Sequence, residues 1–217
     1  MTSLPSGVSR REFNGQQRLA TRGDPIGDEP TTNGWRAWDS ATSKVAAMLD
    51  RDMAIGLAPG QRVLYLGAAA GTTVSHLADI VDVVYAVEFA PRPVRDLLAV
   101  ADSRAGVIPL VKDARQPDSY AHVVESGLDL LFQDVATREQ TSVAIANRRF
   151  LAADGRLVCA LKARSIDVTR EPEAVFETAR AELGEAYEIL AAERLDPLHR
   201  DHLAVVARPR PNDEHEG

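Results

Sequence analysis

The sequence is poor in cysteine and in long apolar runs, and both shortages exclude whole classes of protein. Its 217 residues include one cysteine, Cys159, so no disulfide can form within the chain, and such cysteine usage is typical of a reducing compartment. No apolar run approaches the roughly 20 residues that a membrane-spanning helix needs, and residues 1–5 begin no secretory signal. We therefore expect a cytoplasmic protein without membrane contact. The five histidines show no metal-ligand spacing with Cys159, so no metal site is predicted.

Lysine is almost absent as well. Of the 25 basic residues only Lys44, Lys112 and Lys162 are lysines, and the others are arginines. Because the lysine ammonium is compact and its pKa shifts readily on burial, a retained lysine can mark a position that needs this group, although three can also remain by chance. The net charge of −7 argues against tight unaided binding to a polyanion, which usually needs a basic face.

Hydrophobic periodicity divides the chain into three parts. Residues 1–40 are rich in turn-forming residues and predict a small N-terminal region that is irregular, β-rich or partly disordered. Residues 41–208 alternate short apolar strands with helical segments, which predicts an α/β fold whose mostly parallel sheet is covered on both faces. Residues 209–217 are polar and are expected to form a loose tail. The expected strands are 62–66, 83–87, 107–111, 128–132, 157–161, 187–193 and 203–207, and the expected helices are 44–53, one from 72, 93–101, 120–124, 139–151 and 172–183.

The last two expected strands leave no room for a helix between them. They should therefore form a hairpin that places one antiparallel strand in the sheet. Parallel crossovers followed by such a hairpin are typical of Rossmann-like class I methyltransferases, and this is the predicted fold class.

The central motif occupies residues 63–80, where a strand turns through Gly67 and Gly71 into a helix that starts near Thr72. Such a turn leaves backbone N–H groups at the helix start available to a ligand. Glu88 follows Gly67 by 21 residues, a separation at which an acid can bind the two ribose hydroxyls of a nucleoside. The motif therefore predicts a nucleoside pocket, although it lacks the G-x-G-x-x-G spacing of dinucleotide-binding proteins.

Ligands of such sheets bind outside the carboxyl ends of the strands, and the residues expected there form a coherent set. Phe89 would pack on an adenine face, Asp113 would accept its amino group, and the N–H of Ala114 would face a ring nitrogen. Asp134 and Lys162 follow the next two strands, where a reacting group must lie.

Each of these residues also has a purely structural interpretation. Asp113 and Asp134 could cap the following helices, and Lys162 could be a solvated charge. His76, behind the loop, is expected to be structural. Trp35 and Trp38 lie within four residues and should anchor the N-terminal region, with a base-stacking platform as the alternative.

Taken together, these motifs resemble fibrillarin in its archaeal form, the guide-RNA-dependent 2′-O-methyltransferase of ribosomal and transfer RNA. The resemblance covers roughly residues 18–207. The family usually has Ser where Ala70 stands, and Gln-Pro where Thr137 and Arg138 follow the 134–136 motif, so a contact made by that glutamine is in doubt. The matching stretches are 63–76, 84–89, 113–115, 134–136 and 161–163.

The resemblance implies S-adenosyl-L-methionine as cofactor and a catalytic Lys-Asp-Lys set that falls on Lys44, Asp134 and Lys162. Lys44 belongs to the first turn of a helix that Ser40 or Ser43 could cap. The implied cofactor-binding residues are Gly67, Ala68, Thr72, Thr73, Glu88, Phe89, Asp113, Ala114, Asp134, Val135, Ala136 and Thr137.

The implied partners are a box C/D guide RNA with its target rRNA or tRNA, a Nop-family scaffold protein and a kink-turn-binding protein of ribosomal type. Such partners suit an acidic chain, because RNA affinity depends on the phosphates that a protein neutralises. Three alternatives remain: a methyltransferase acting on a protein or small molecule, an NAD-dependent oxidoreductase, and a non-enzymatic subunit of an RNA particle.

Overall fold

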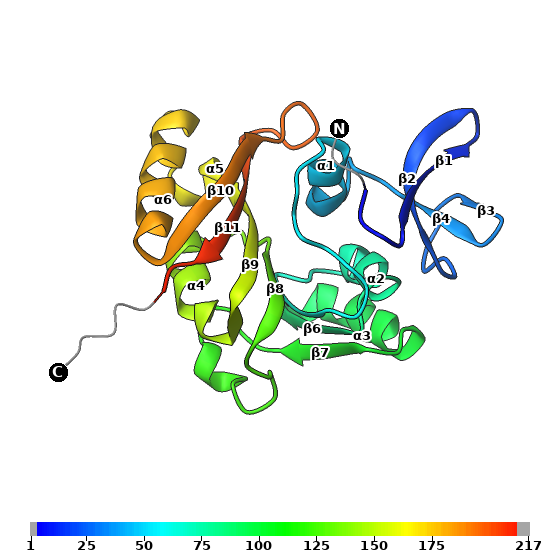
Figure 1. Ribbon diagram of the computed structural model, residues 1–217, viewed down its shortest axis with the longest axis horizontal. Helices are drawn as coiled ribbons and strands as arrows, with labels where there is room; N and C mark the ends of the chain where they lie inside the picture. Colours follow the sequence, from blue (N-terminus) through cyan, green and yellow to red (C-terminus); the bar gives the residue numbers. More distant parts are fainter. Residues whose placement is uncertain (1–3, 212–217) are drawn as a thin grey trace.

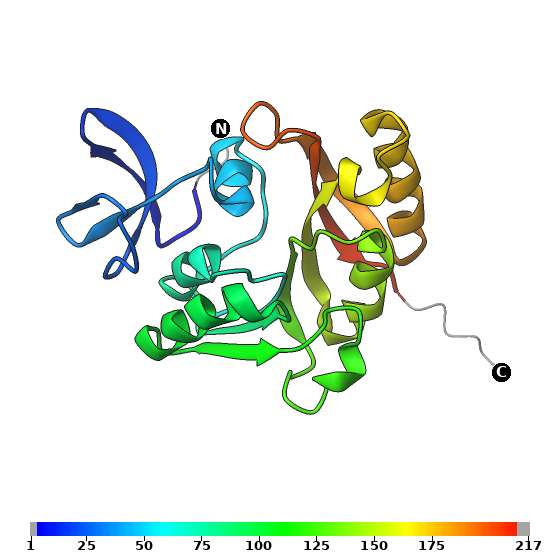
Figure 2. The same cartoon turned by 180° about the vertical axis from the view of Figure 1, so that it is seen from behind.

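The computed structural model describes residues 4–211 and contains a small and a large sheet, the large one with helices on both faces. Figures 1 and 2 show the small sheet at one end of the molecule, beside α1 and α2. None of the helices between residues 4 and 211 combines the length and the apolar character that crossing a membrane requires.

The N-terminal region is β-rich, and its turns explain why. Two-residue Asn-Gly turns need positive φ at both residues, and they match the twist of a hairpin. Asn14 and Gly15 have φ of 51° and 79°, and Asn33 and Gly34 have φ of 50° and 76°. These two turns build an antiparallel sheet in the order β1-β2-β4-β3. Its strands are β1 (Val8–Phe13), β2 (Gln16–Arg22), β3 (Thr31–Thr32) and β4 (Trp35–Trp38).

The large sheet has the predicted topology. Its order is β10-β11-β9-β8-β5-β6-β7; β11 is antiparallel to both neighbours, and every other pair is parallel. The α/β fold with a C-terminal hairpin is thus confirmed. The strands are β5 (Arg62–Leu66), β6 (Val83–Glu88), β7 (Val107–Val111), β8 (Leu128–Gln133), β9 (Leu151–Lys162), β10 (Tyr187–Arg194) and β11 (His202–Pro209).

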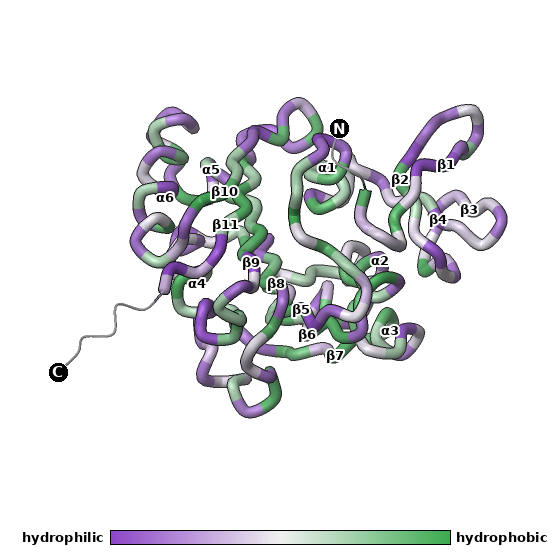
Figure 3. Tube along the Cα trace, viewed as in Figure 1, coloured by the Kyte–Doolittle hydropathy of each residue, from purple (hydrophilic) through white to green (hydrophobic). Residues whose placement is uncertain are grey.

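Helices cover the two faces of this sheet because its strands are apolar on both sides. In β5, Val63 and Tyr65 belong to the core cluster that contains residues of α1, α2 and α3, whereas Leu64 and Leu66 belong to the cluster that contains residues of α4, α5 and α6. Figure 3 shows α1 and β9 as mainly hydrophobic and the outer part of the β1–β2 hairpin as hydrophilic. The helices are α1 (Lys44–Asp50), α2 (Thr72–Ala78), α3 (Pro91–Ser103), α4 (Gln140–Asn147), α5 (Ala163–Ile166) and α6 (Pro172–Ala186).

Several predicted elements have other bounds in the structure; the strand expected over 157–161, for example, runs from Leu151 to Lys162. The helix expected over 139–151 stops at Asn147 and is followed by the 3-10 turn η2 (Arg148–Phe150), because Leu151 already pairs with β8. The helix expected over 120–124 is replaced by the 3-10 turn η1 (Pro117–Ser119) and further turns. The first helix ends at Asp50, shortly before Asp52 takes a positive φ of 56°.

Residues 209 and 210, which were expected to belong to a loose tail, still contact the β10–β11 hairpin. Pro209 still pairs with Tyr187, and the N–H of Arg210 donates to the carbonyl of Ala186. Both bonds extend the β10–β11 hairpin beyond its predicted length. Residues 212–217 lie outside the described part of the chain.

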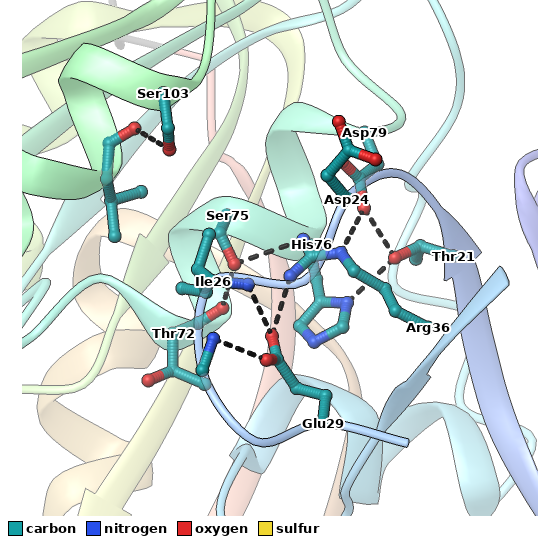
Figure 4. A network of polar contacts seen from close by, with 12 residues as sticks. Thr21, Asp24, Ile26, Glu29, Arg36, Thr72, Ser75, His76, Asp79 and Ser103 are labelled. Atoms are coloured by element: carbon teal, nitrogen blue, oxygen red, sulfur yellow. Dashed lines mark hydrogen bonds and ion pairs between the residues drawn. The ribbon is translucent and has the colours of Figure 1, made fainter. Parts of the chain in front are cut away.

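A buried arginine joins the small sheet to α2 (Figure 4). The guanidinium of Arg36 in β4 is fully buried; it donates to Asp79 at 2.8 Å, to Glu29 at 2.9 Å and to the hydroxyl of Ser75 at 3.1 Å. The Ser75 hydroxyl in turn donates to the carbonyl of Thr72 in the first turn of α2, at 2.8 Å. The three bonds offset part of the cost of burying the charge, and they join α2 to β4.

The two tryptophans differ in environment. Trp38 is buried and stacks on His76 of α2, with ring centroids 4.9 Å apart and an angle of 11° between the planes. The anchoring interpretation is therefore confirmed for Trp38. Trp35 is half-buried, and the guanidinium groups of Arg11 and Arg22 lie 4.6 and 4.9 Å from its ring centroid.

His76 should make folding dependent on pH. Burial, with the nearby Arg36 and Arg104, lowers its pKa to about 2, whereas an unfolded histidine titrates near 6.5. As the pH falls below about 6.5, the unfolded chain binds a proton that the folded chain excludes, so stability present at higher pH is lost. We expect His76 to account for a loss on the order of 1 kcal/mol between pH 8 and 5.5.

The measurement is urea unfolding of the wild type and of His76→Gln at both pH values. Glutamine can still bond Thr21, which contacts the His76 ring at 2.7 Å, but it does not titrate. The variant should lose correspondingly less stability on acidification. An equal loss in both proteins would contradict the assignment.

Candidate active site

A cavity of about 450 Å³ opens at the carboxyl ends of β5, β6, β7 and β8. The chain runs from β5 through β6 to β7 at one edge of the sheet and then returns to β8 on the other side of β5. The cavity lies at this reversal of strand order, the usual ligand position in open α/β folds. Its size suits a nucleoside-like ligand. The residues that line it are Gly67, Ala69, Val87, Glu88, Phe89, Lys112, Asp113, Ala114, Arg115, Asp134, Val135, Ala136, Thr137 and Val143.

Gly67 lets the ends of β5 and β8 approach each other. Its φ is +82°, and a Cβ placed on it would lie 2.3 Å from the carbonyl oxygen of Asp134. The N–H groups of Gly67 and Ala68 both donate to the carbonyl of Val87 at 3.0 Å, so the turn is fixed to β6. A side chain here would displace the 134–137 backbone from the cavity wall.

Glu88 is the carboxylate that lies deepest in the cavity wall. One of its oxygens, Oε1, accepts the N–H groups of Phe89 and Ala90 at 2.9 and 2.8 Å, and Oε2 accepts that of Ala69 at 3.0 Å. A carboxylate oxygen has two acceptor positions, so Oε2 keeps one for a ligand. The Phe89 side chain is 59% exposed at the cavity wall, which leaves its ring face available for stacking.

Asp113 also lines the cavity, but its carboxylate is engaged by Arg115. The Arg115 side chain donates to both of its oxygens, and the Arg115 N–H donates to Oδ1 at 2.9 Å. The hydrogen bonds from Arg115 lower the pKa of Asp113, so the group is ionised at neutral pH. Behind it, the carbonyl of Ala114 accepts bonds from Tyr120 at 3.2 Å and Asn147 at 2.9 Å.

Three of the predicted cofactor residues do not line this cavity. Ala68 is buried, and Thr72 faces a second groove between residues 25–29 and α3. The hydroxyl of Thr73 donates to that of Ser43 at 3.0 Å. The contacts predicted for these three residues with a cofactor stay predictions.

The predicted catalytic residues Lys44 and Asp134 form an ion pair beside the cavity. The Nζ of Lys44 lies 2.7 Å from Oδ2 of Asp134, and both side chains are partly exposed. Ser43 is the N-cap of α1, accepting the N–H of Ala46 at 3.3 Å, and so places Lys44 as the first helical residue. A cation at this end of a helix opposes the helix dipole, and Asp134 compensates for it.

Lys162 is the last residue of β9, which neighbours β8 in the sheet. Within residues 4–211 its ammonium has no hydrogen bond or ion pair. The three predicted catalytic residues thus come from α1, the loop after β8 and the end of β9.

Comparison with known proteins identifies the family. A sequence model described as "Fibrillarin" matches residues 13–211. The chain is 60% identical over 209 residues to the fibrillarin-like rRNA/tRNA 2′-O-methyltransferase of Halobacterium salinarum, covering 96% of this chain and 100% of that protein. The chain belongs to the fibrillarin family.

Solved structures agree with this assignment. A fibrillarin in a fibrillarin/Nop5p complex superimposes with a TM-score of 0.90 at 39% identity, covering 96% of this chain and 100% of that chain. The Aeropyrum pernix fibrillarin with natively bound S-adenosyl-L-methionine has a TM-score of 0.80 at 39% identity, covering 95% and 100%. The fibrillarin resemblance predicted from the motifs is confirmed.

Sequence reasoning missed two histidines beside the candidate site of this chain. His202 opens β11 and pairs with Lys162, and the ring of His199 lies 5.9 Å from that of His202. Burial lowers the pKa of His202, the charges of Lys44 and His199 lower it further, and the carbonyl of Arg200 and the charge of Asp134 oppose these effects. His202 is therefore mostly neutral at pH 7.

The position of the His202 proton follows from its partner. Its Nδ1 lies 2.7 Å from the carbonyl oxygen of Arg200, which can only accept, so Nδ1 carries the proton. Nε2 is then an acceptor, and it has no hydrogen-bond partner in the described part of the chain. The available sequence signal was a histidine directly before the last strand. Only the register between β9 and β11 places it beside Lys162.

Proposed function

We propose that this chain transfers the methyl group of S-adenosyl-L-methionine to the 2′-hydroxyl of ribose in ribosomal and transfer RNA. The observation that carries the proposal is the placing of Lys44 and Asp134 together at the edge of a nucleoside-sized cavity, with Lys162 at the end of the adjacent strand. Family membership and the activity in the name of the Halobacterium salinarum protein support it.

The cavity suits S-adenosyl-L-methionine. Glu88 would accept the ribose hydroxyls through the free position on Oε2, and Phe89 would cover the adenine. Residues Val135, Ala136 and Thr137 would line the remainder of the cofactor. When bound, the cofactor supplies a methyl group on a positively charged sulfur.

The polar residues beside the cavity would hold and activate the RNA hydroxyl. Asp134, fixed by Lys44, accepts a hydrogen bond from the 2′-hydroxyl, and Lys162 orients its oxygen. The two ammonium groups stabilise negative charge as it develops on that oxygen. The neutral Nε2 of His202 is an additional proton acceptor near this set.

Two observations support the proposed partners, namely the net charge of the chain and the complex formed by a related protein. The fibrillarin/Nop5p complex supports a Nop-family scaffold for this chain. A net charge of −7 makes the chain a weak RNA binder by itself, so we further propose a box C/D guide RNA and a kink-turn-binding protein. The guide would then select the nucleotide by base pairing, while the enzyme recognises the 2′-hydroxyl.

The test is methyl transfer from labelled S-adenosyl-L-methionine to a guide–target RNA duplex, with and without the protein partners. We expect turnover with the assembled particle at least 100-fold faster than with the chain alone. Equal rates would contradict the partner proposal. Absence of transfer by the complete particle would contradict the proposed activity.

A further inference from the structure

The neighbouring strands β8 and β9 separate just before they reach the proposed catalytic residues. Their pairing ends at Gln133 and Cys159, whereas Lys162 lies three residues farther along β9. On its other side Lys162 pairs with His202 of β11. Its backbone N–H and carbonyl on the β8 side therefore need another partner, because buried backbone groups are rarely left unpaired.

The side chain of Gln140 is that partner. Its Oε1 accepts the N–H of Lys162 at 2.9 Å, and its Nε2 donates to the carbonyl of Lys162 at 3.2 Å. A side-chain amide carries the same donor and acceptor as a peptide group. Gln140 thus takes the place of the strand residue that β8 lacks at this level.

The same side chain fixes the loop that carries Asp134. Nε2 of Gln140 also donates to the carbonyl of Thr137 at 2.9 Å, and the Gln140 carbonyl accepts from the side chain of Gln133 at 2.8 Å. Gln140 is fully buried at the start of α4. It therefore connects the last residue of β8, the loop over 134–139 and the last residue of β9.

The two ammonium groups of the site are held differently. Lys44 is held by its ion pair with Asp134, but the ammonium of Lys162 has no partner within residues 4–211. Its direction then depends on the backbone from which the side chain extends, and Gln140 binds both polar groups of that backbone.

We propose that Gln140 is a positioning residue for methyl transfer, holding the Lys162 backbone and the 134–139 loop at the separation that the reaction needs. The inference rests on the proposed function. Misplacing a reacting group by about 1 Å can cost on the order of 100-fold in rate, so loss of Gln140 should slow chemistry more than it weakens cofactor binding.

Two variants test this. Gln140→Leu removes the donor and the acceptor, and Gln140→Glu keeps the shape but places a carboxylate oxygen against the carbonyls of Thr137 and Lys162. Gln61→Leu is the matched control, because the Gln61 amide likewise joins two backbone groups, accepting from Ala58 at 2.8 Å and donating to Gly56 at 2.9 Å. Gln61 lies before β5, at the opposite end of the sheet from the site.

The measurements are the single-turnover rate in the assembled particle at saturating RNA and cofactor, the cofactor Kd, and the urea midpoint. We expect both Gln140 variants to lose 10- to 100-fold in rate with a Kd change below fivefold. Gln61→Leu should lose stability but keep its rate within threefold.

Rates within threefold of wild type in both Gln140 variants would overturn the proposal, as would a loss no greater than that of Gln61→Leu at equal stability. If Gln140→Leu does not fold, Gln140→Glu alone decides on the same thresholds. A wild-type particle that transfers no methyl group would instead mark failure of the proposed function.

Discussion

Replacing Lys162 by alanine should lower the rate of methyl transfer at least 100-fold and leave the affinity for S-adenosyl-L-methionine nearly unchanged. The ribose hydroxyl is a weak acid, so its oxygen needs a positive charge and a proton acceptor as the methyl group arrives. Losing one such electrostatic group typically costs about 10²–10³-fold in rate. Lys162 lies outside the wall of the cofactor cavity, so binding should survive.

The measurement combines single-turnover methyl transfer in the assembled particle with calorimetric titration of the cofactor. Arg164→Ala is a suitable control, because it removes a positive charge two residues away that pairs with Asp201 at 3.3 Å and does not line the cavity. The control should keep its rate within threefold. Unchanged turnover in Lys162→Ala would exclude the catalytic role, and a parallel loss of cofactor affinity would assign Lys162 to binding.

Replacing Gly67 by alanine should destabilise the protein by about 2–5 kcal/mol and weaken cofactor binding. Positive φ costs a residue with a Cβ about 1–2 kcal/mol, and overpacking typically adds about 1–3 kcal/mol. The added Cβ would lie 2.3 Å from the backbone oxygen of Asp134 and 3.1 Å from Val135. Relief of this contact must move the loop that forms the cavity wall.

Gly60→Ala separates the cost of the positive φ from the cost of the close contact that the added Cβ makes. Gly60 has the same φ of +82°, but a Cβ there has no neighbour within 4 Å. Urea unfolding should therefore show a loss of only about 1–2 kcal/mol for Gly60→Ala, with cofactor affinity unchanged. Equal losses of stability in the two variants would mean that the close approach of Asp134 to Gly67 does not add to the destabilisation.

Most residues that line the candidate cofactor cavity were predictable, because they are close to one another in sequence or follow successive strands. The motif from Gly67 to Glu88 has a spacing that parallel strands impose, and strand ends meet at one edge of a sheet. The same reasoning placed Phe89, Asp113 and Asp134 at the cavity. It could not show that Arg115 engages the carboxylate of Asp113, because side-chain geometry decides that contact.

The N-terminal region was less well predicted, although its signal was present. Asn14-Gly15 and Asn33-Gly34 are strong hairpin turns, and each lies between residues that form strands. Local sequence patterns could not show how this small sheet attaches to the rest of the molecule. The bond from Arg36 to Asp79 joins residues 43 positions apart, and nothing in either segment identifies the other.

By itself, the sequence determined the chain order of the strands in the large sheet, the C-terminal hairpin and the family, because periodicity, turn residues and contiguous motifs are local properties of the chain. Only the tertiary structure decided which polar groups meet. Lys44 reaches Asp134 across 90 residues, His202 lies beside Lys162 through a strand register, and Gln140 replaces a missing strand residue. Such contacts depend on distances between elements, which no local pattern encodes.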